Sequence, residues 1–170
     1  KNNTKDITPK HYSLPEAVVS VACCDTFLIA LTNNGKIYGN GHANEEKDEF
    51  VEMQEISDFG PFIQISGTYE HCLVLNKNGR VYGFGSNYKG RLSLSSEIRT
   101  VDTFVLLESF DNILISDISA GFYHSLFLMK NTEIASCGRN TFGELLASQP
   151  TKDCYFVPIH TKVKANSKVS

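Results

Sequence analysis

The chain has 170 residues, of which 41% are hydrophobic and 21% charged, and this composition excludes intrinsic disorder and suffices for one domain. The formal net charge of −3 gives no overall attraction to nucleic acid or to anionic membranes. The first residues, KNNTKD, show no signal-peptide pattern, and no apolar run is long enough to span a membrane. We therefore expect an intracellular protein, cytoplasmic or nuclear, that binds neither nucleic acid nor membrane directly.

Cysteine and histidine spacing argues against a disulfide framework and against a metal site. The five cysteines are odd in number, form no CxxC pair and lie mostly in apolar runs, so we expect reduced thiols inside the protein. His11, His42 and His160 have no metal-ligand spacing to Cys, Asp or Glu. The sequence thus predicts no metal and no cofactor.

In chain order, a polar segment (1–10) is followed by HYSL (11–14), which we expect to form an outer strand of a preceding blade. Three units then align without gaps: VVSVACCDTFLIALTNNGKIYGNG (18–41), FIQISGTYEHCLVLNKNGRVYGFG (62–85) and ISDISAGFYHSLFLMKNTEIASCG (115–138). Gly79 lies 44 residues after Gly35, and His124 lies 53 residues after His71. Internal repetition at this period indicates a repeat architecture.

Each unit predicts three short strands. The first is β-branched, the second alternates apolar and polar residues, as expected of a strand with one buried face, and the third is KIYGNG, RVYGFG or EIASCG. Asn34-Gly35 and Asn78-Gly79 predict type I′ hairpin turns between the second and third strands. Unit three has Asn131-Thr132 there, a costlier turn and so a weak point.

A fourth strand is expected after a loop of variable length, at FVEM (50–53), FVLL (104–107) and YFVPI (155–159). Four antiparallel strands repeating every 40–50 residues predict an all-β protein made of β-propeller blades, with very little helix. We expect about three blades, in units 18–53, 62–107 and 115–159, within a partial propeller spanning residues 11–159. Residues 160–170 form a polar tail or linker.

The repeated motifs resemble those of the regulator of chromosome condensation repeat family. They are GFYHS (121–125) followed by Leu128, GSNYKGRL (85–92) and GRNTFGEL (138–145). Unit one departs from the pattern, with Phe27 in place of the histidine and an acidic stretch after Gly41. The resemblance implies a seven-bladed β-propeller, of which three blades form less than half. We therefore expect an arc completed by the rest of a longer chain, a second copy or another subunit, because open strand edges invite pairing.

Residues that recur at equivalent repeat positions are interpreted as structural. Repetition of His71 and His124 favours a hydrogen bond within each blade over a catalytic or metal pair. The recurring glycines are backbone devices rather than a phosphate loop, because no helix opens behind them. The glycines assigned this role are Gly35, Gly79, Gly85, Gly90, Gly138 and Gly143.

The candidate contact residues lie on equivalent loops of adjacent units and should share one rim. Tyr, Phe and Arg often anchor protein interfaces, and an acidic loop could attract a basic partner. The candidates are Tyr88, Lys89, Arg91, Arg139, Phe142 and Glu144, with Glu45, Glu46 and Asp48 in the acidic loop.

No nucleophile motif or acid–base pair predicts catalysis, so we expect a non-catalytic module that presents blade loops to a partner protein. The family resemblance implies two alternatives. One is a guanine nucleotide exchange regulator of a small GTPase such as Ran. The other is the substrate-recruiting part of a larger ubiquitin ligase.

Overall fold

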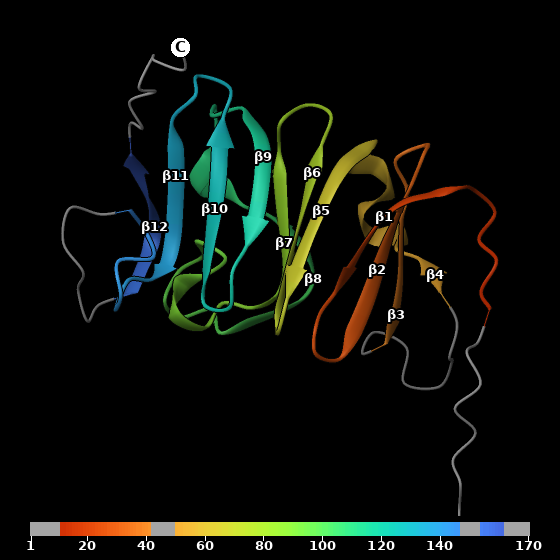
Figure 1. Ribbon diagram of the computed structural model, residues 1–170, viewed down its shortest axis with the longest axis horizontal. Helices are drawn as coiled ribbons and strands as arrows, with labels where there is room; N and C mark the ends of the chain where they lie inside the picture. The colour runs from red at the N-terminus through yellow and green to blue at the C-terminus, as the bar shows by residue number, and fades with distance from the viewer. Residues whose placement is uncertain (1–10, 42–49, 147–153, 162–170) are drawn as a thin grey trace, which may run out of the picture.

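The computed structural model describes residues 11–41, 50–146 and 154–161, and these residues form three separate four-stranded antiparallel sheets (Figure 1). Blade 1 contains β1 (Val18–Cys23), β2 (Phe27–Thr32), β3 (Ile37–Gly41) and β4 (Val51–Glu52). Blade 2 contains β5 (Phe62–Thr68), β6 (His71–Asn76), β7 (Val81–Ser86) and β8 (Thr100–Leu106). Blade 3 contains β9 (Ile115–Ala120), β10 (His124–Met129), β11 (Ile134–Arg139) and β12 (Cys154–Thr161).

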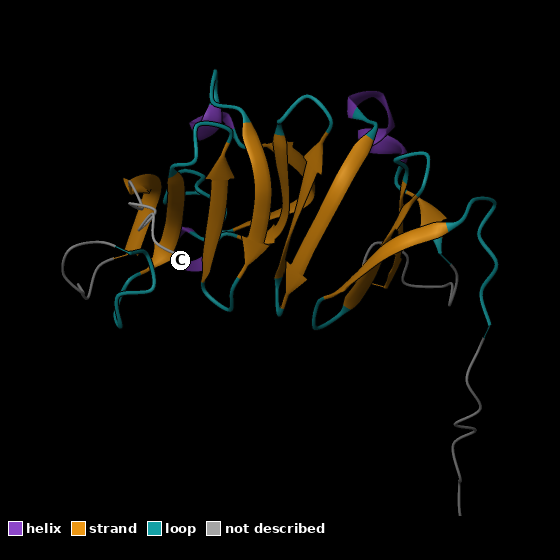
Figure 2. Ribbon diagram, turned by 45° about the horizontal axis from the view of Figure 1, so that its top comes forward, coloured by secondary structure: helices purple, strands orange, loops and turns teal. Residues whose placement is uncertain are grey.

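Helix in the described part of the chain is limited to three short 3-10 turns, shown in Figure 2 among the strands. They are η1 (Gln54–Phe59), η2 (Tyr88–Gly90) and η3 (Glu108–Phe110). None of the described helices is long and apolar enough to cross a membrane. The prediction of all-β propeller blades is confirmed. Residues 11–14, expected to be an outer strand of a preceding blade, form no strand with the three described sheets.

The three sheets stand side by side as an arc (Figure 1), and adjacent blades meet through their first strands. β5 contacts β1 on one side and β9 on the other. Strands within each sheet follow in chain order, so each blade runs outward from these first strands to β4, β8 or β12. This up-and-down order brings the turns after the first and third strands of every blade to the same end.

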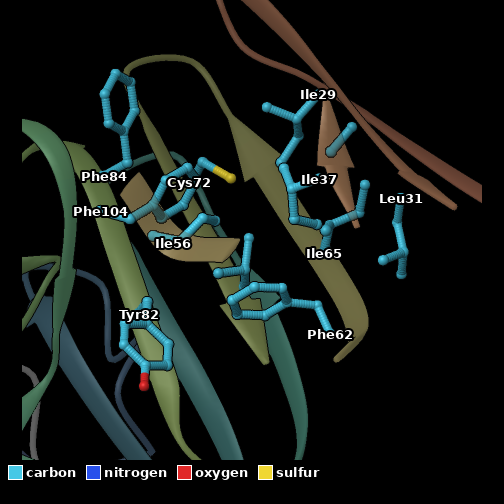
Figure 3. Close-up of a cluster of buried hydrophobic side chains, with 12 residues drawn as sticks. Ile29, Leu31, Ile37, Ile56, Phe62, Ile65, Cys72, Tyr82, Phe84 and Phe104 are labelled. Atoms are coloured by element: carbon cyan, nitrogen blue, oxygen red, sulfur yellow. The ribbon is translucent and has the colours of Figure 1, made fainter. Parts of the chain in front are cut away.

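β6 is buried along all six residues because it lies between two blades. Cys72 and Val74 belong to a cluster shared with blade 1, and Figure 3 shows part of it, with Ile29 and Ile37 facing Ile65. The alternate residues Leu73 and Leu75 belong to a second cluster shared with blade 3. The period of two seen in the sequence therefore separates two apolar interfaces rather than an inner and an outer face.

Blades 1 and 3 each present an open face that corresponds to a buried one in blade 2. Leu128 matches the buried Leu75 in repeat position but is 39% exposed. On the opposite side of the arc, Val21 matches the buried Ile65 and is 68% exposed. The central blade is thus fully packed, whereas each outer blade is packed on one side.

The hairpin turns differ from the type I′ geometry expected at Asn34-Gly35 and Asn78-Gly79. Only the glycines have positive φ, +83° at Gly35 and +79° at Gly79. In blade 2 the N–H of Gly79 donates to Asn76 O, and the Asn76 side chain accepts from the backbone of Asn78 and Arg80. This pattern is that of a type I turn followed by one left-handed glycine, and the buried Asn76 stabilises it.

The equivalent left-handed position in blade 3 is Thr132, with φ of +70°. A β-branched residue is strained there by about 1–2 kcal/mol. We expect Thr132→Gly to raise the free energy of unfolding by about 1 kcal/mol, after allowing for the greater flexibility of glycine in the unfolded chain. Urea denaturation measures this change.

Gly79→Ala is the matched control, because φ is +79° and an added Cβ would lie 3.1 Å from the carbonyl oxygen of Ile115 in the next blade. It should destabilise the protein by about 1–2 kcal/mol. Equal effects of the two substitutions would contradict the strain argument.

Candidate functional site

Turns from blades 2 and 3 meet at one end of the arc and gather a set of aromatic and arginine side chains. We call this set the aromatic–arginine rim. Its members come from the β5–β6 and β9–β10 turns, from the end of β11 and from the loops that follow β7 and β11. They are Tyr69, Tyr88, Arg91, Phe122, Tyr123, Arg139 and Phe142.

The aromatic rings of the rim contact one another across the junction between the two blades. Tyr69 of blade 2 stacks on Phe122 of blade 3, with ring centroids 4.4 Å apart and an interplanar angle of 18°. Phe122 meets Tyr123 edge to face at 4.4 Å, and Tyr123 meets Tyr88 in the same manner at 5.9 Å. Such pairs each add about 0.5–1.5 kcal/mol beyond their buried area.

Two guanidinium groups lie over these rings. Arg91 Cζ lies 5.3 Å from the ring centroid of Tyr123, and Arg139 Cζ lies 4.7 Å from the same centroid and 5.3 Å from that of Phe142. Cation–π contacts of this kind contribute about 0.5–1 kcal/mol at exposed positions and more when desolvated. The rim is therefore held in place before any partner binds.

Arg91 differs from the expectation of an exposed contact residue, because its side chain is 0% exposed. Its Nε donates to Tyr88 O, Nη1 donates to Phe122 O, and Nη2 donates to Ser86 Oγ and Glu70 Oε2. Burial lowers the pKa of the Arg91 guanidinium, and the Glu70 carboxylate opposes that shift. Arg91 fastens the loop of blade 2 to the β9–β10 turn of blade 3.

Glu144 orders the corresponding loop of blade 3 through hydrogen bonds inside the protein. Arg139 Nε donates to Glu144 Oε1 at 2.8 Å, and the Phe142 N–H donates to Oε2 at 2.7 Å. Burial raises the pKa of Glu144, but these hydrogen bonds and the Arg139 charge outweigh it, so the pKa lies below its ordinary value. The backbone of Phe142 is thus fixed by this network, while the residue is 77% exposed.

Of the other residues proposed from the sequence, Tyr88 is 54% exposed and Lys89 is half-buried, with Nζ 5.0 Å from the Tyr88 ring centroid. Glu45, Glu46 and Asp48 lie outside the described residues. Tyr69, Phe122 and Tyr123 were missed by sequence reasoning. An aromatic residue at the same repeat position, Tyr69 in unit two and Phe122 in unit three, was the signal that could have found them.

The predicted hydrogen bond of His71 within its own blade is wrong, because it joins two blades instead. His71 Nε2 lies 3.0 Å from Ser125 Oγ of blade 3, and the Ser125 hydroxyl donates to Arg91 O at 2.7 Å. Since the hydroxyl proton is used on Arg91 O, Nε2 must be the protonated nitrogen that donates to Ser125. The three residues form a buried chain of hydrogen bonds between blades 2 and 3.

The His71–Ser125 pair has the contact of a catalytic dyad but not its surroundings. Both side chains are 0% exposed, and the buried His71 Nδ1 has no hydrogen-bond partner, so no carboxylate orients the ring. Blade 3 carries His124 at the same repeat position, and its buried Nδ1 is also unpartnered. In the described part of the chain, no group of three or more His, Cys, Asp and Glu side chains could hold a metal ion.

Burial, together with the smaller effects of the charges of Arg91 and His124, lowers the pKa of His71 to about 3. The unfolded chain, with a histidine pKa of about 6.5, binds the proton more readily, so stability present above that pH is lost as pH falls toward 3. We expect the contribution of His71 to lower the free energy of unfolding by about 2 kcal/mol when the pH falls from 7 to 5.

Urea denaturation at the two pH values measures this loss, and His71→Phe should make the dependence shallower. An unchanged pH dependence in that variant would contradict the assignment to His71.

The described cysteines form no disulfide, and Cys72 and Cys137 are buried. Burial raises the pKa of Cys137 to about 12 and moves that of Cys72 well above its ordinary value, so these thiols are poor nucleophiles. Cys23, which we expected inside the protein, is exposed.

Comparison with protein families gives matches across blades 2 and 3. A family model described as "Regulator of chromosome condensation (RCC1) repeat" matches residues 62–91 and 115–144, and a second model of the same description matches 78–128. The human "Probable E3 ubiquitin-protein ligase HERC6" is 28% identical over 75% of this chain and 13% of its own length. The "Guanine nucleotide exchange factor SRM1" of Saccharomyces cerevisiae is 24% identical over 87% of this chain and 33% of its own length.

Solved structures share the fold. Human WBSCR16 superposes with a TM-score of 0.73 at 18% identity, over 87% of this chain and 38% of that structure. Prp20p from Saccharomyces cerevisiae superposes with a TM-score of 0.71 at 19% identity, over 88% of this chain and 39% of that structure. The chain thus spans well under half the length of each of these proteins.

Proposed function

Because the chain belongs to the regulator of chromosome condensation repeat family, we propose that it is a non-catalytic interaction module whose aromatic–arginine rim contacts a partner protein. The observation that supports this most strongly is the exposure of aromatic rings within a fixed network. Tyr69, Tyr88, Phe122 and Phe142 are between 38% and 77% exposed. Their neighbours Arg91 and Arg139 are held by carboxylates.

The composition and rigidity of the rim suit a protein interface. Tyrosine, phenylalanine and arginine are enriched among residues that dominate binding energy. Side chains already fixed in their positions lose little conformational entropy when a partner binds. Phe142 has the largest exposed fraction of the described large hydrophobic side chains, so we assign it the role of principal anchor.

We propose further that the rim belongs to a propeller segment at residues 11–159, with repeat units 18–53, 62–107 and 115–159. The open faces of blades 1 and 3 would be covered by other blades, from a longer chain, a second copy or another subunit. We infer an intracellular location, in cytoplasm or nucleus, and no cofactor. The acidic residues Glu45, Glu46 and Asp48 remain candidates for a basic partner.

Two other functions are favoured by the relatives. The yeast SRM1 and a bovine protein, "Secretion-regulating guanine nucleotide exchange factor", are both named as exchange factors, so nucleotide exchange on a small GTPase is the second candidate. HERC6 is named a probable ubiquitin ligase, so substrate recruitment within a larger ligase is the third. Release of fluorescent GDP from a panel of small GTPases tests exchange, and no acceleration of release would remove the second candidate.

Site-specific photocrosslinking tests the binding function. A photoreactive phenylalanine analogue replaces Phe142 in one variant and Leu114 in the other. Leu114 is 47% exposed and immediately precedes β9, whose opposite end leads to the rim. In extract of the source cells, we expect a discrete protein adduct from position 142 and none from position 114. Adducts from position 114 alone, or the same adducts from both, would contradict the assignment of the rim.

A further inference from the structure

A hollow of about 740 Å³ opens at the aromatic–arginine rim, lined by blade 2 and by Tyr123 of blade 3. Tyr69, Tyr88 and Tyr123 contribute aromatic side chains to its lining, and Lys89 and Arg99 contribute cations. Its volume lies within the range of about 300–1,000 Å³ typical of small-ligand sites. It is therefore large enough to receive several side chains of a peptide segment.

The charges that line the hollow do not cancel. Glu70 is the single acidic side chain among the described residues of the lining, and its carboxylate accepts from the buried Arg91 at 3.0 Å. Among the described residues, no carboxylate forms an ion pair with Lys89 or Arg99. The hollow thus carries two uncompensated positive charges in a chain whose formal net charge is −3.

The wall that carries Arg99 is fixed by the protein itself. Asn87, which is 1% exposed, donates from Nδ2 to the carbonyl oxygens of Leu94, Ser95 and Ile98. The Asn87 N–H donates to Arg99 O at 2.7 Å. One buried side chain therefore positions the segment 94–99 opposite η2, where Lys89 lies, and the hollow exists without a ligand.

We propose that this hollow binds an acidic peptide segment of the partner protein, with its carboxylates on Lys89 and Arg99 and its apolar side chains against the tyrosines. This inference rests on the proposed binding function and specifies the chemistry of the partner. The charges favour a carboxylate-bearing segment, because complementary charge selects partners and speeds their encounter. A nucleic-acid strand is disfavoured, because it needs a longer track of cations than the two found here.

Fluorescence anisotropy with a defined probe tests the proposal. The probe is a fluorescein-labelled peptide of alternating glutamate and phenylalanine, and the control probe has glutamine in place of glutamate. We expect the glutamate peptide to bind the 170-residue chain at least about tenfold more tightly than the glutamine peptide. Lys89→Glu and Arg99→Glu should each weaken binding of the glutamate peptide by about tenfold or more.

Lys77→Glu is the matched control for charge, because Lys77 is exposed on the β6–β7 turn at the opposite end of the same blade. It should leave the affinity unchanged. Equal binding of the two peptides, or equal loss in Lys77→Glu, would overturn the proposal, as would tighter binding of a single-stranded oligonucleotide that depends on Lys89 and Arg99. Crosslinking from Phe142 would still report a protein partner in those cases, so failure of the acidic-segment proposal is distinguishable from failure of the binding function.

Discussion

Replacing Arg91 with methionine is expected to lower the free energy of unfolding by about 3 kcal/mol, among the largest effects of any single change considered for this protein. The substitution keeps much of the apolar volume but removes four hydrogen bonds from the guanidinium. It leaves two backbone carbonyl oxygens, of Tyr88 and Phe122, without that donor. Both hydrogen bonds are partly buried, and an unsatisfied group that is fully buried costs about 1–3 kcal/mol.

Urea denaturation followed by circular dichroism measures the loss. Arg91→Lys should recover only part of it, because an ammonium cannot reproduce the planar fork of donors. Arg80→Met is the control: Arg80 forms an exposed ion pair with Asp111, and such pairs contribute about 0–1 kcal/mol. If Arg80→Met and Arg91→Met destabilised the protein equally, the role of Arg91 in joining blades 2 and 3 would be wrong.

In the buried chain of hydrogen bonds between blades 2 and 3, His71 and Ser125 should show strong energetic coupling. At the equivalent repeat positions of the junction between blades 1 and 2, the residues are Phe27 and Cys72, which share an apolar cluster. The polar pair of one junction is therefore replaced by an apolar pair in the other. The two residues of a junction are therefore matched, both polar or both apolar, because changing one of them alone would leave a buried polar group without a partner.

We expect His71→Phe and Ser125→Cys each to cost about 2 kcal/mol of unfolding free energy, and the double variant to cost clearly less than the sum. The interaction energy, obtained from denaturation of all four proteins, should be about 1–2 kcal/mol in favour of the matched pairs. His124→Phe, on the open face of blade 3, should cost less than His71→Phe. Strict additivity of the two substitutions would contradict the matched-pair interpretation.

The fold could be predicted from the sequence because the repeat period, the turn glycines and the alternation in the strands all indicated four-stranded blades. The fourth strand of each blade was found within a few residues, as at β8, predicted at 104–107 and observed at Thr100–Leu106. The outer strand expected at 11–14 had no matching unit in the chain to support it, and the described residues show no strand there. Agreement between units was therefore the dependable signal.

The candidate site could be predicted only in part from the sequence, because the contacts that hold it together lie between two blades. Sequence comparison located the loops of Tyr88 and Phe142, yet it could not show that Arg91 turns inward toward Phe122 O. Nor could it show that His71 finds its partner 54 residues away in the next blade. Contacts of this kind depend on how two blades pack, which no local pattern records.

Hydrogen–deuterium exchange of the chain, alone and with the partner captured through position 142, tests the central claim most directly. We predict that binding slows exchange in the segments 69–70, 88–92, 122–123 and 139–145, which carry the rim. Exchange at the opposite turns, 33–36, 77–80 and 130–133, should not change. Protection confined to those opposite turns or to the outer faces of blades 1 and 3, with no change at the rim, would contradict the account.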